Sequence, residues 1–151
     1  MAHALRLPNF GMGRPLRREE EYNRRQWSEV RGLQTPAWLK EVYDRISALA
    51  ELEENWDSHG GLPVASGAIS ETRILLSNLA IEELPKPHVA PIPDGSVGLH
   101  WRVGGRDLEI EIEASGPVHY LKTYVGCDSI EDGDVHSLKD AQDALDWVLG
   151  R

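Results

Sequence analysis

The chain has 151 residues, of which 40% are hydrophobic and 27% are charged, and its formal net charge is -9. These proportions are ordinary for a globular domain and exclude collagen-like, mucin-like and wholly disordered chains. A single cysteine, Cys127, excludes an intrachain disulfide framework and a cysteine-rich zinc site. No apolar run reaches the roughly 20 residues of a membrane-spanning helix, and the N-terminus lacks the apolar segment of a secretory signal. We therefore expect a cytoplasmic protein without membrane contact.

The charge is unevenly distributed along the chain. Residues 1–40 hold eight basic and four acidic residues, whereas the remainder holds eight basic and 21 acidic ones. We divide the chain into a basic arm, residues 1–33, and an α+β domain, residues 34–151. The arm's candidate partner-binding residues are Arg17, Arg18, Arg24, Arg25, Trp27 and Arg31.

Such an arm can bind an acidic protein or a second copy of the chain. A solvated, salt-bridged helix is the simpler interpretation, because isolated charge runs usually contribute little. Nucleic acid is a weaker expectation, since no aromatic-interleaved basic patch or reader motif accompanies the arginines.

Apolar residues at helical spacing predict three helices in the domain, over about residues 36–53, 66–82 and 137–149. Thr35 is a favourable N-cap for the first helix, with Pro36 at the first helical position. Ser137 and Asp140 have the spacing of a capping box at the start of the last helix.

Residues 88–125 alternate between apolar and polar, which is typical of strands. Gly104-Gly105 predicts a two-residue hairpin turn. Pairing around it places Trp101 opposite Leu108, Leu99 opposite Ile110 and Val97 opposite Ile112. The polar face then pairs His100 with Glu109 and Arg102 with Asp107.

Two further turns are predicted at Asp94-Gly95 and Ser115-Gly116. The first sets Ile92 against Val97 and Ala90 against Leu99. The second sets Ile110 against Leu121, Glu109 against Lys122 and Glu111 against Tyr120, with His119 toward the core. An acidic loop follows over residues 128–134. The predicted fold is α+β: a four-stranded antiparallel meander over about residues 88–125, with helices packed on its apolar face.

Three carboxylates, Glu109, Glu111 and Glu113, share the polar face of one predicted strand. At about 7 Å spacing they could hold a divalent cation or perform acid–base chemistry. We favour a solvated face, because an open sheet supplies no pocket. The cross-strand groups expected to neutralise it are His100, Arg102 and Lys122.

The segment Asn-Trp-Asp-Ser-His-Gly-Gly-Leu-Pro, residues 55–63, forms a second candidate site. Asp57 and His59 could pair as a general base or as metal ligands. The favoured alternative is a turn in which Asp57 accepts backbone N–H bonds, Gly60-Gly61 reverse the chain and Trp56 packs into the core.

Other chemistry is weakly indicated. No phosphate-binding loop, zinc motif or nucleophile elbow is present, so no cofactor and no metal is predicted. Cys127 is expected to be a buried small hydrophobe rather than a nucleophile.

Three motifs in order, within residues 55–63, 87–101 and 108–112, read NWDSHGGLP, PHVAPIPDGSVGLHW and LEIEI. The chain resembles a group of small uncharacterised bacterial proteins that share an NWDxxGxxP loop, a PDGxVxLxW hairpin and an LEIEI strand. The resemblance covers about residues 50–115. It implies a bacterial or phage source and one unit made by loop and hairpin, and it implies no activity.

The sequence thus favours a non-enzymatic interaction module. It would bind a protein partner, or a second copy as a homodimer, through the basic arm and the polar sheet face. The alternative is a small metal-dependent hydrolase or nuclease that uses Asp57 and His59 together with Glu109, Glu111 and Glu113.

Overall fold

The structure is a computed structural model, and it describes residues 36–79 and 84–151. The basic arm therefore lies outside the described residues. In chain order the elements are α2 (Ala37–Leu49), α3 (Ser66–Asn78), β1 (His88–Pro91), β2 (Val97–Val103), β3 (Arg106–Ile112), β4 (Val118–Tyr124), β5 (Ser129–Asp134) and α4 (Leu138–Leu149).

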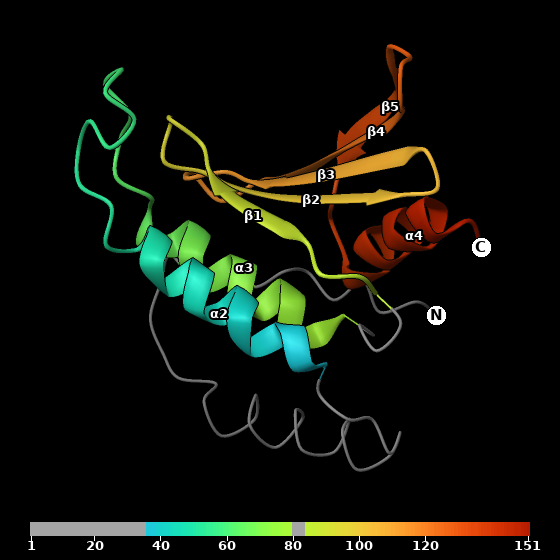
Figure 1. The fold of residues 1–151 in the computed structure, drawn as a ribbon, viewed down its shortest axis with the longest axis horizontal. Helices are drawn as coiled ribbons and strands as arrows, with labels where there is room; N and C mark the ends of the chain where they lie inside the picture. The colour runs from blue at the N-terminus through green and yellow to red at the C-terminus, as the bar shows by residue number, and fades with distance from the viewer. Residues whose placement is uncertain (1–35, 80–83) are drawn as a thin grey trace.

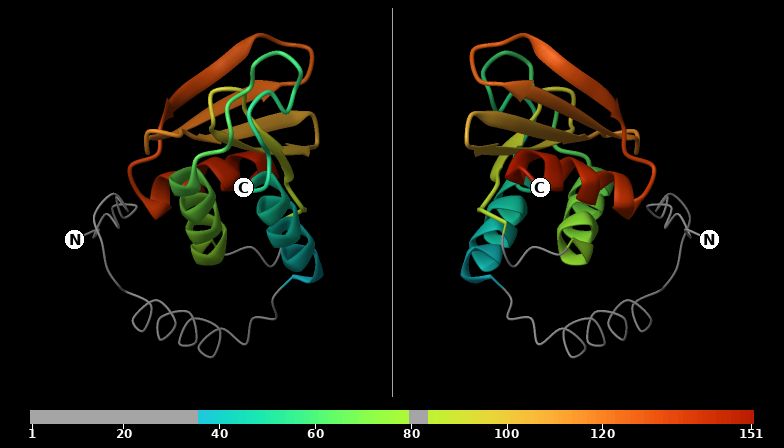
Figure 2. Two further views of the ribbon diagram at one scale, coloured as in Figure 1. Left: turned by 90° about the vertical axis from the view of Figure 1, so that its left-hand side faces the viewer. Right: turned by 90° about the vertical axis from the view of Figure 1, so that its right-hand side faces the viewer.

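The five strands form one antiparallel sheet in the order β1-β2-β3-β4-β5. The described helices all lie on one face of this sheet, with α2 and α3 side by side (Figure 1, Figure 2). The C-terminal helix α4 packs against β2, β3 and β4. The α+β class is confirmed. The predicted number of strands is wrong, because β5 adds a fifth to the expected four.

The β2–β3 hairpin has the predicted register. Trp101 lies opposite Leu108, Leu99 opposite Ile110 and Val97 opposite Ile112. Gly104 and Gly105 have φ values of 55° and 80°, the left-handed region that a two-residue hairpin turn requires. All six paired apolar side chains are buried, so a slip of one residue would turn them toward solvent.

The other two predicted registers are each wrong by one residue. In β1–β2 the observed pairs are Val89 with Leu99 and Pro91 with Val97, instead of Ala90 with Leu99 and Ile92 with Val97. In β3–β4 the observed pairs are Ile110 with Tyr120, Glu109 with Leu121 and Glu111 with His119, instead of Ile110 with Leu121, Glu109 with Lys122 and Glu111 with Tyr120. Each shift moves the side chains of one strand to the opposite face.

The first error comes from the length of the β1–β2 loop. The Gly95 amide donates to the Ile92 carbonyl at 2.9 Å, and the Ile92 amide donates to Ser96 at 3.0 Å. These bonds enclose a three-residue loop in which Pro93 takes the first central position of the turn. Gly95 then takes the left-handed position, with φ 92°. Asp94-Gly95 is therefore not a two-residue turn.

The β3–β4 connection repeats this arrangement. The Glu113 amide donates to Pro117 at 2.9 Å, and the Gly116 amide donates to Glu113 at 3.0 Å. Gly116 has φ 115°. Residues 114–116 thus form the loop, one residue more than predicted, and the extra residue reverses the facing of β4.

Strand β5 replaces the acidic loop expected over residues 128–134. It pairs antiparallel with β4, with an irregularity between Lys122 and Thr123. A Cβ on Gly133 would lie 2.9 Å from the hydroxyl of Tyr120, so the tyrosine ring uses the space that the glycine leaves. Pairing with β4, rather than an apolar pattern of its own, makes this segment a strand.

The core lies between the sheet and the helices. Its largest fully buried side chain is Trp101, whose indole N–H donates to the Pro85 carbonyl at 3.0 Å. Trp38 on α2 donates to the Leu84 carbonyl, also at 3.0 Å. These bonds satisfy two indole donors and tie residues 84–85 to both α2 and β2.

The first two described helices are shorter than predicted. α2 ends at Leu49 rather than at residue 53, and α3 ends at Asn78 rather than at residue 82. Pro36 is the N-cap of α2 and not its first helical residue, and no side chain caps this helix. The expected cap, Thr35, lies outside the described residues.

The last helix begins as predicted. The Ser137 hydroxyl accepts the Asp140 amide at 3.2 Å, and the Asp140 carboxylate accepts the Ser137 amide at 3.1 Å. This reciprocal pair is the expected capping box. The helix ends at Gly150, whose φ of 78° is left-handed.

The exposed edge of β1 is protected against pairing with another strand. Arg45 donates to the Val89 carbonyl at 3.3 Å, and Pro91 has no N–H to offer. An unprotected edge would be a template for association. Contacts with other proteins are therefore more readily made by the faces of the molecule than by this edge.

Candidate functional site

The candidate site is the face of the sheet that the described helices leave uncovered, which we call the open face (Figure 2). Every second residue of each strand points to the open face, because the residues between point into the core. Its acidic members come from β3, the turn after it, and β5: Asp107, Glu109, Glu111, Glu113, Asp132 and Asp134.

One end of the open face is neutralised. Arg102 donates to both carboxylate oxygens of Asp107, at 2.7 and 3.0 Å, as the sequence predicts. The ring of His100 lies 3.0 Å from the same carboxylate, although its register partner is Glu109. The Arg102 hydrogen bond is the main cause that lowers the pKa of Asp107, and His100 adds to it.

At the other end, His119 is held between two carboxylates. Its Nε2 lies 2.7 Å from Glu113 and its Nδ1 lies 2.6 Å from Asp134. The predicted facing of His119 toward the core is therefore wrong, because the longer β3–β4 loop places it on the open face. A carboxylate only accepts, so both ring nitrogens donate when the ring carries its second proton.

The two carboxylates favour the charged ring. Partial burial opposes this charge, but hydrogen bonds to Asp134 and Glu113 outweigh burial and raise the pKa of His119 above its ordinary value of 6.5. His136 lies 3.8 Å from the second oxygen of Asp134. The stability that this arrangement adds is present below pH 6.5 and is lost as pH rises through the raised pKa.

We expect Glu113→Gln to move the titration midpoint of His119 to lower pH, because it removes one of the two charges that favour the imidazolium. Proton NMR of the ring across pH 5–9 measures the midpoint. The control Glu109→Gln removes a charge from the same face without a hydrogen bond to His119. Equal shifts in the two variants would contradict a direct role for the Glu113 contact.

Lys122 does not neutralise the glutamates, contrary to the prediction. The register shift turns it to the helix side, where it lies 3.0 Å from Glu131 and over the rings of Tyr120 and Trp147. The Tyr120 hydroxyl also donates to Glu131, and this hydrogen bond, followed by burial, raises the pKa of Tyr120 to about 12. The open face therefore lacks the lysine that the sequence had assigned to it.

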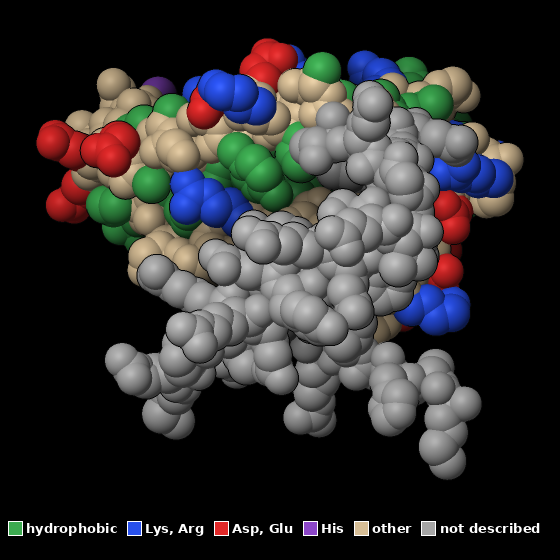
Figure 3. Space-filling model, turned by 90° about the horizontal axis from the view of Figure 1, so that it is seen from below, with side chains coloured by type: hydrophobic (Ala, Val, Ile, Leu, Met, Phe, Trp, Pro, Cys, Tyr) green, Lys and Arg blue, Asp and Glu red, His purple; other side chains and the backbone are tan. Residues whose placement is uncertain are grey.

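Between these two ends, three carboxylates of β3 and β5 have no cationic partner among the described residues. Among the described residues, Glu109, Glu111 and Asp132 have neither a hydrogen bond nor an ion pair through their carboxylates. Burial, then the charges of Asp94 and Glu113, raise the pKa of Glu111, and the charge of His119 opposes this in part. On the helix side, the part of the rim that Figure 3 shows carries both acidic and basic side chains.

The second candidate site, residues 55–63, is a hydrogen-bonded loop. One oxygen of Asp57 accepts the amides of His59 and Gly61 at 2.9 and 2.8 Å, and Asn55 accepts the Gly60 amide at 2.8 Å. The hydrogen bonds from the His59 and Gly61 amides are the leading causes of the lowered pKa of Asp57. The favoured interpretation of Asp57 as an acceptor of backbone N–H groups is confirmed.

The loop also differs from the prediction in one side chain. Trp56 is half-buried and donates to the Leu62 carbonyl at 2.9 Å, so it braces the loop rather than entering the core. Toward the sheet, the Leu62 amide of the loop donates to the Pro93 carbonyl at 2.8 Å, and the Ala65 amide just after the loop donates to the Gly95 carbonyl at 2.9 Å. The loop and the β1–β2 hairpin thus form one bonded unit.

The structure does not unite the residues of the catalytic alternative. No hydrogen bond or ion pair in residues 36–79 and 84–151 joins Asp57 or His59 to the glutamates. Within that part of the chain, no three His, Cys, Asp or Glu side chains are grouped so that they could hold a metal ion. Cys127 is exposed, which corrects the expectation that it is buried.

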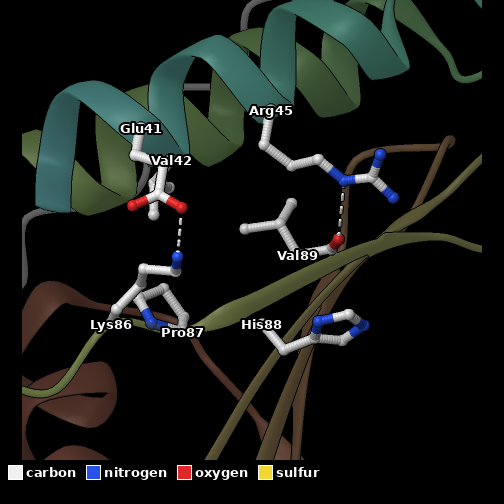
Figure 4. Close-up of a pocket in the computed structure, with 7 residues that line it drawn as sticks. All are labelled: Glu41, Val42, Arg45, Lys86, Pro87, His88 and Val89. Carbon is white, nitrogen blue, oxygen red and sulfur yellow. Dashed lines mark hydrogen bonds and ion pairs between the residues drawn. The ribbon is translucent and has the colours of Figure 1, made fainter.

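A cleft of about 300 Å³ lies between α2 and the start of β1 (Figure 4). An ion pair between Glu41 and Lys86 crosses it, and Arg45 donates to the strand. None of the predicted catalytic residues lines it; the lining residues are Glu41, Val42, Arg45, Lys86, Pro87, His88 and Val89. Its charged side chains are engaged with one another and with the β1 backbone.

The His119 arrangement is the feature of the open face that sequence reasoning missed. The signal for it was present: Gly116 follows Ala114-Ser115, and a three-residue loop with glycine third predicts the observed register. The six predicted partner-binding residues of the basic arm lie outside the described residues.

No described helix has the length and hydrophobicity that a bilayer crossing requires. Comparisons with protein-family models, curated proteins and solved structures give no match to this chain.

Proposed function

We propose that this protein is a non-enzymatic interaction module whose open face receives a basic segment of a protein. The segment belongs to a partner protein or to a second copy of the chain, and the basic arm takes part in the contact. The observation that carries the proposal is a group of carboxylates that form no ion pair with a described residue, on a face that no described helix covers: Glu109, Glu111 and Asp132.

Electrostatics support this use of the face. A surface of one sign attracts a segment of the opposite sign from a distance and orients it on approach. The helix side instead carries local pairs such as Lys40 with Asp44 and Lys139 with Asp143. Such exposed pairs neutralise their own surface and contribute little beyond it.

The hydrolase alternative has less support from the geometry. The Asp57 oxygen that would serve as a base or ligand already accepts two amides, and its loop makes no bonded contact with the glutamates. Deleting residues 1–33 discriminates the classes: an interaction module is expected to keep a folded body and lose its partner, whereas a hydrolase centred on Asp57 would keep its activity.

The proposal is tested with the full chain and a fluorescent octa-arginine peptide, by anisotropy at low salt. We expect Glu109→Gln/Glu111→Gln to weaken binding by about tenfold, because two unpaired carboxylates are lost from the contact. The control Glu51→Gln/Glu53→Gln removes the same net charge from an exposed segment after α2. Equal weakening in both variants would contradict a role for the open face.

A further inference from the structure

The paired and unpaired carboxylates of the open face, and the surface beside them, define what it can bind. Asp107, Glu113 and Asp134 are occupied by Arg102 and the histidines. The carboxylates without a partner among the described residues therefore lie on the central strand β3 and on the edge strand β5.

The surface next to these charges is small or apolar, with Leu121 of β4 between β3 and β5 and with β1 and β2 on the other side of β3. Ala90 lies opposite Gly98 on β1 and β2, and Leu121 lies opposite both Glu109 and Asp132. Ala90, Gly98 and Leu121 are all partly exposed. An occupant that places cations on the carboxylates can therefore also bury aliphatic stems or an aromatic ring beside them.

The chain itself carries a segment of this chemistry. Residues 1–33 contain seven arginines, no lysine and four glutamates. Three of those glutamates are consecutive, Glu19–Glu21, so the stretch after them is the more basic part. Within residues 22–33, Arg24, Arg25 and Arg31 flank Trp27 with a single acid, Glu29. Guanidinium groups match carboxylates in planar, paired hydrogen bonds, and tryptophan supplies buried contact area.

The short tether between Arg31 and Pro36 favours the open face of a second copy over the chain's own. Arg31 is five residues before Pro36, which allows at most about 18 Å of extended chain. α2 begins on the helix side of the sheet (Figure 1), so a segment joined to it reaches its own open face only by passing around the sheet. A second copy can present its open face directly.

We propose that residues 22–33 of one chain dock on the open face of a second copy, and that the exchange is reciprocal in a two-fold dimer. Arg24, Arg25 and Arg31 contact Glu109, Glu111 and Asp132 of the other chain. Closed two-fold symmetry provides two such contacts per dimer, and the second forms at a high effective concentration once the first is made. This inference rests on the proposed function and names its partner.

A charge-exchange experiment with full-length chains tests the dimer. We expect the wild-type chain to sediment as a dimer at low salt and to dissociate at high salt. Glu109→Lys/Glu111→Lys and Arg24→Glu/Arg25→Glu are each expected to weaken self-association by about tenfold or more. Mixing these two variants restores the dimer, because each face then meets an arm of opposite sign. Glu51→Lys/Glu53→Lys is the control for net charge, and circular dichroism checks folding.

Each contrary result has a distinct meaning. Variants that remain monomeric when mixed would overturn exchange between copies. A wild-type chain that is monomeric but binds octa-arginine through the open face would overturn the dimer and leave the proposed function standing. A chain that neither dimerises nor binds the peptide would overturn both.

Discussion

Replacing Glu71 by glutamine is expected to stabilise the protein at pH 8 by up to about 3 kcal/mol, and to leave its stability nearly unchanged at pH 4. Glu71 lies on α3 with 7% of its surface exposed. Burial is the cause that raises its pKa from 4.5 to about 7. No described residue forms an ion pair with it.

The sign follows from the two pKa values. Below pH 4.5 the carboxyl is mostly protonated in both states, and its neutral form avoids the cost of burying a charge. As pH rises toward 7, the unfolded chain releases its proton first, so the free energy of unfolding falls. Above pH 7 the folded state holds a buried charge. Glutamine has nearly the same shape and never ionises, so the variant avoids this loss.

Urea denaturation at pH 4, 6 and 8 measures the effect, with Glu51→Gln at an exposed position as the control. The gain for the Glu71 variant should grow across this series while that of the control stays small. A gain of the same size at pH 4 and pH 8 would show that ionisation of Glu71 is not its cause.

Replacing Gly95 by alanine is expected to destabilise the protein by about 2–4 kcal/mol and to detach residues 55–63 from the sheet. Gly95 has φ 92°, and a Cβ there would lie 3.0 Å from the backbone carbonyl of Pro63. Its own carbonyl accepts the Ala65 amide. Both the backbone conformation and the close approach therefore require glycine.

Gly104→Ala is the matched control, because Gly104 also has positive φ but has no atom within 4 Å of the added Cβ. It should lose only about 1–2 kcal/mol. Thermal unfolding compares the two variants, and hydrogen exchange of the Leu62 and Ala65 amides reports on the loop. If these amides exchange no faster in the Gly95 variant than in the Gly104 variant, the contact does not hold the loop.

The hairpins show how far sequence reasoning reaches for this fold. The β2–β3 register was predictable because Gly104-Gly105 specifies a two-residue turn and every apolar residue finds an apolar partner. The flanking loops also contain glycine, but Pro93 and Gly116 belong to loops of three residues rather than two. The pairing of apolar residues alone did not reveal that the predicted registers were wrong by one residue. Strand β5 was not predictable from its acidic composition, because its partner β4 rather than its own pattern makes it a strand.

The same shift decides how much of the candidate site was predictable. The glutamates were placed correctly, since β3 pairs with β2 as expected. Their charge balance was not, because one residue more in the next loop takes Lys122 away and brings His119 in. The sequence predicts a neutralised face, whereas Glu109, Glu111 and Asp132 have no ion pair among the described residues. The Asp57 turn was predictable because its acceptors and glycines act within nine residues of one another.

The strand order also bears on how the molecule is made. Every strand pairs with the strand before it in the chain, so the sheet can grow by successive hairpin closures, each across a short loop. During synthesis α2 and α3 emerge before the strands, so no sheet yet covers their apolar faces. These apolar faces stay exposed until β2 and β3 have left the ribosome. We therefore expect this stage of synthesis to be the one at which the chain most needs protection from aggregation.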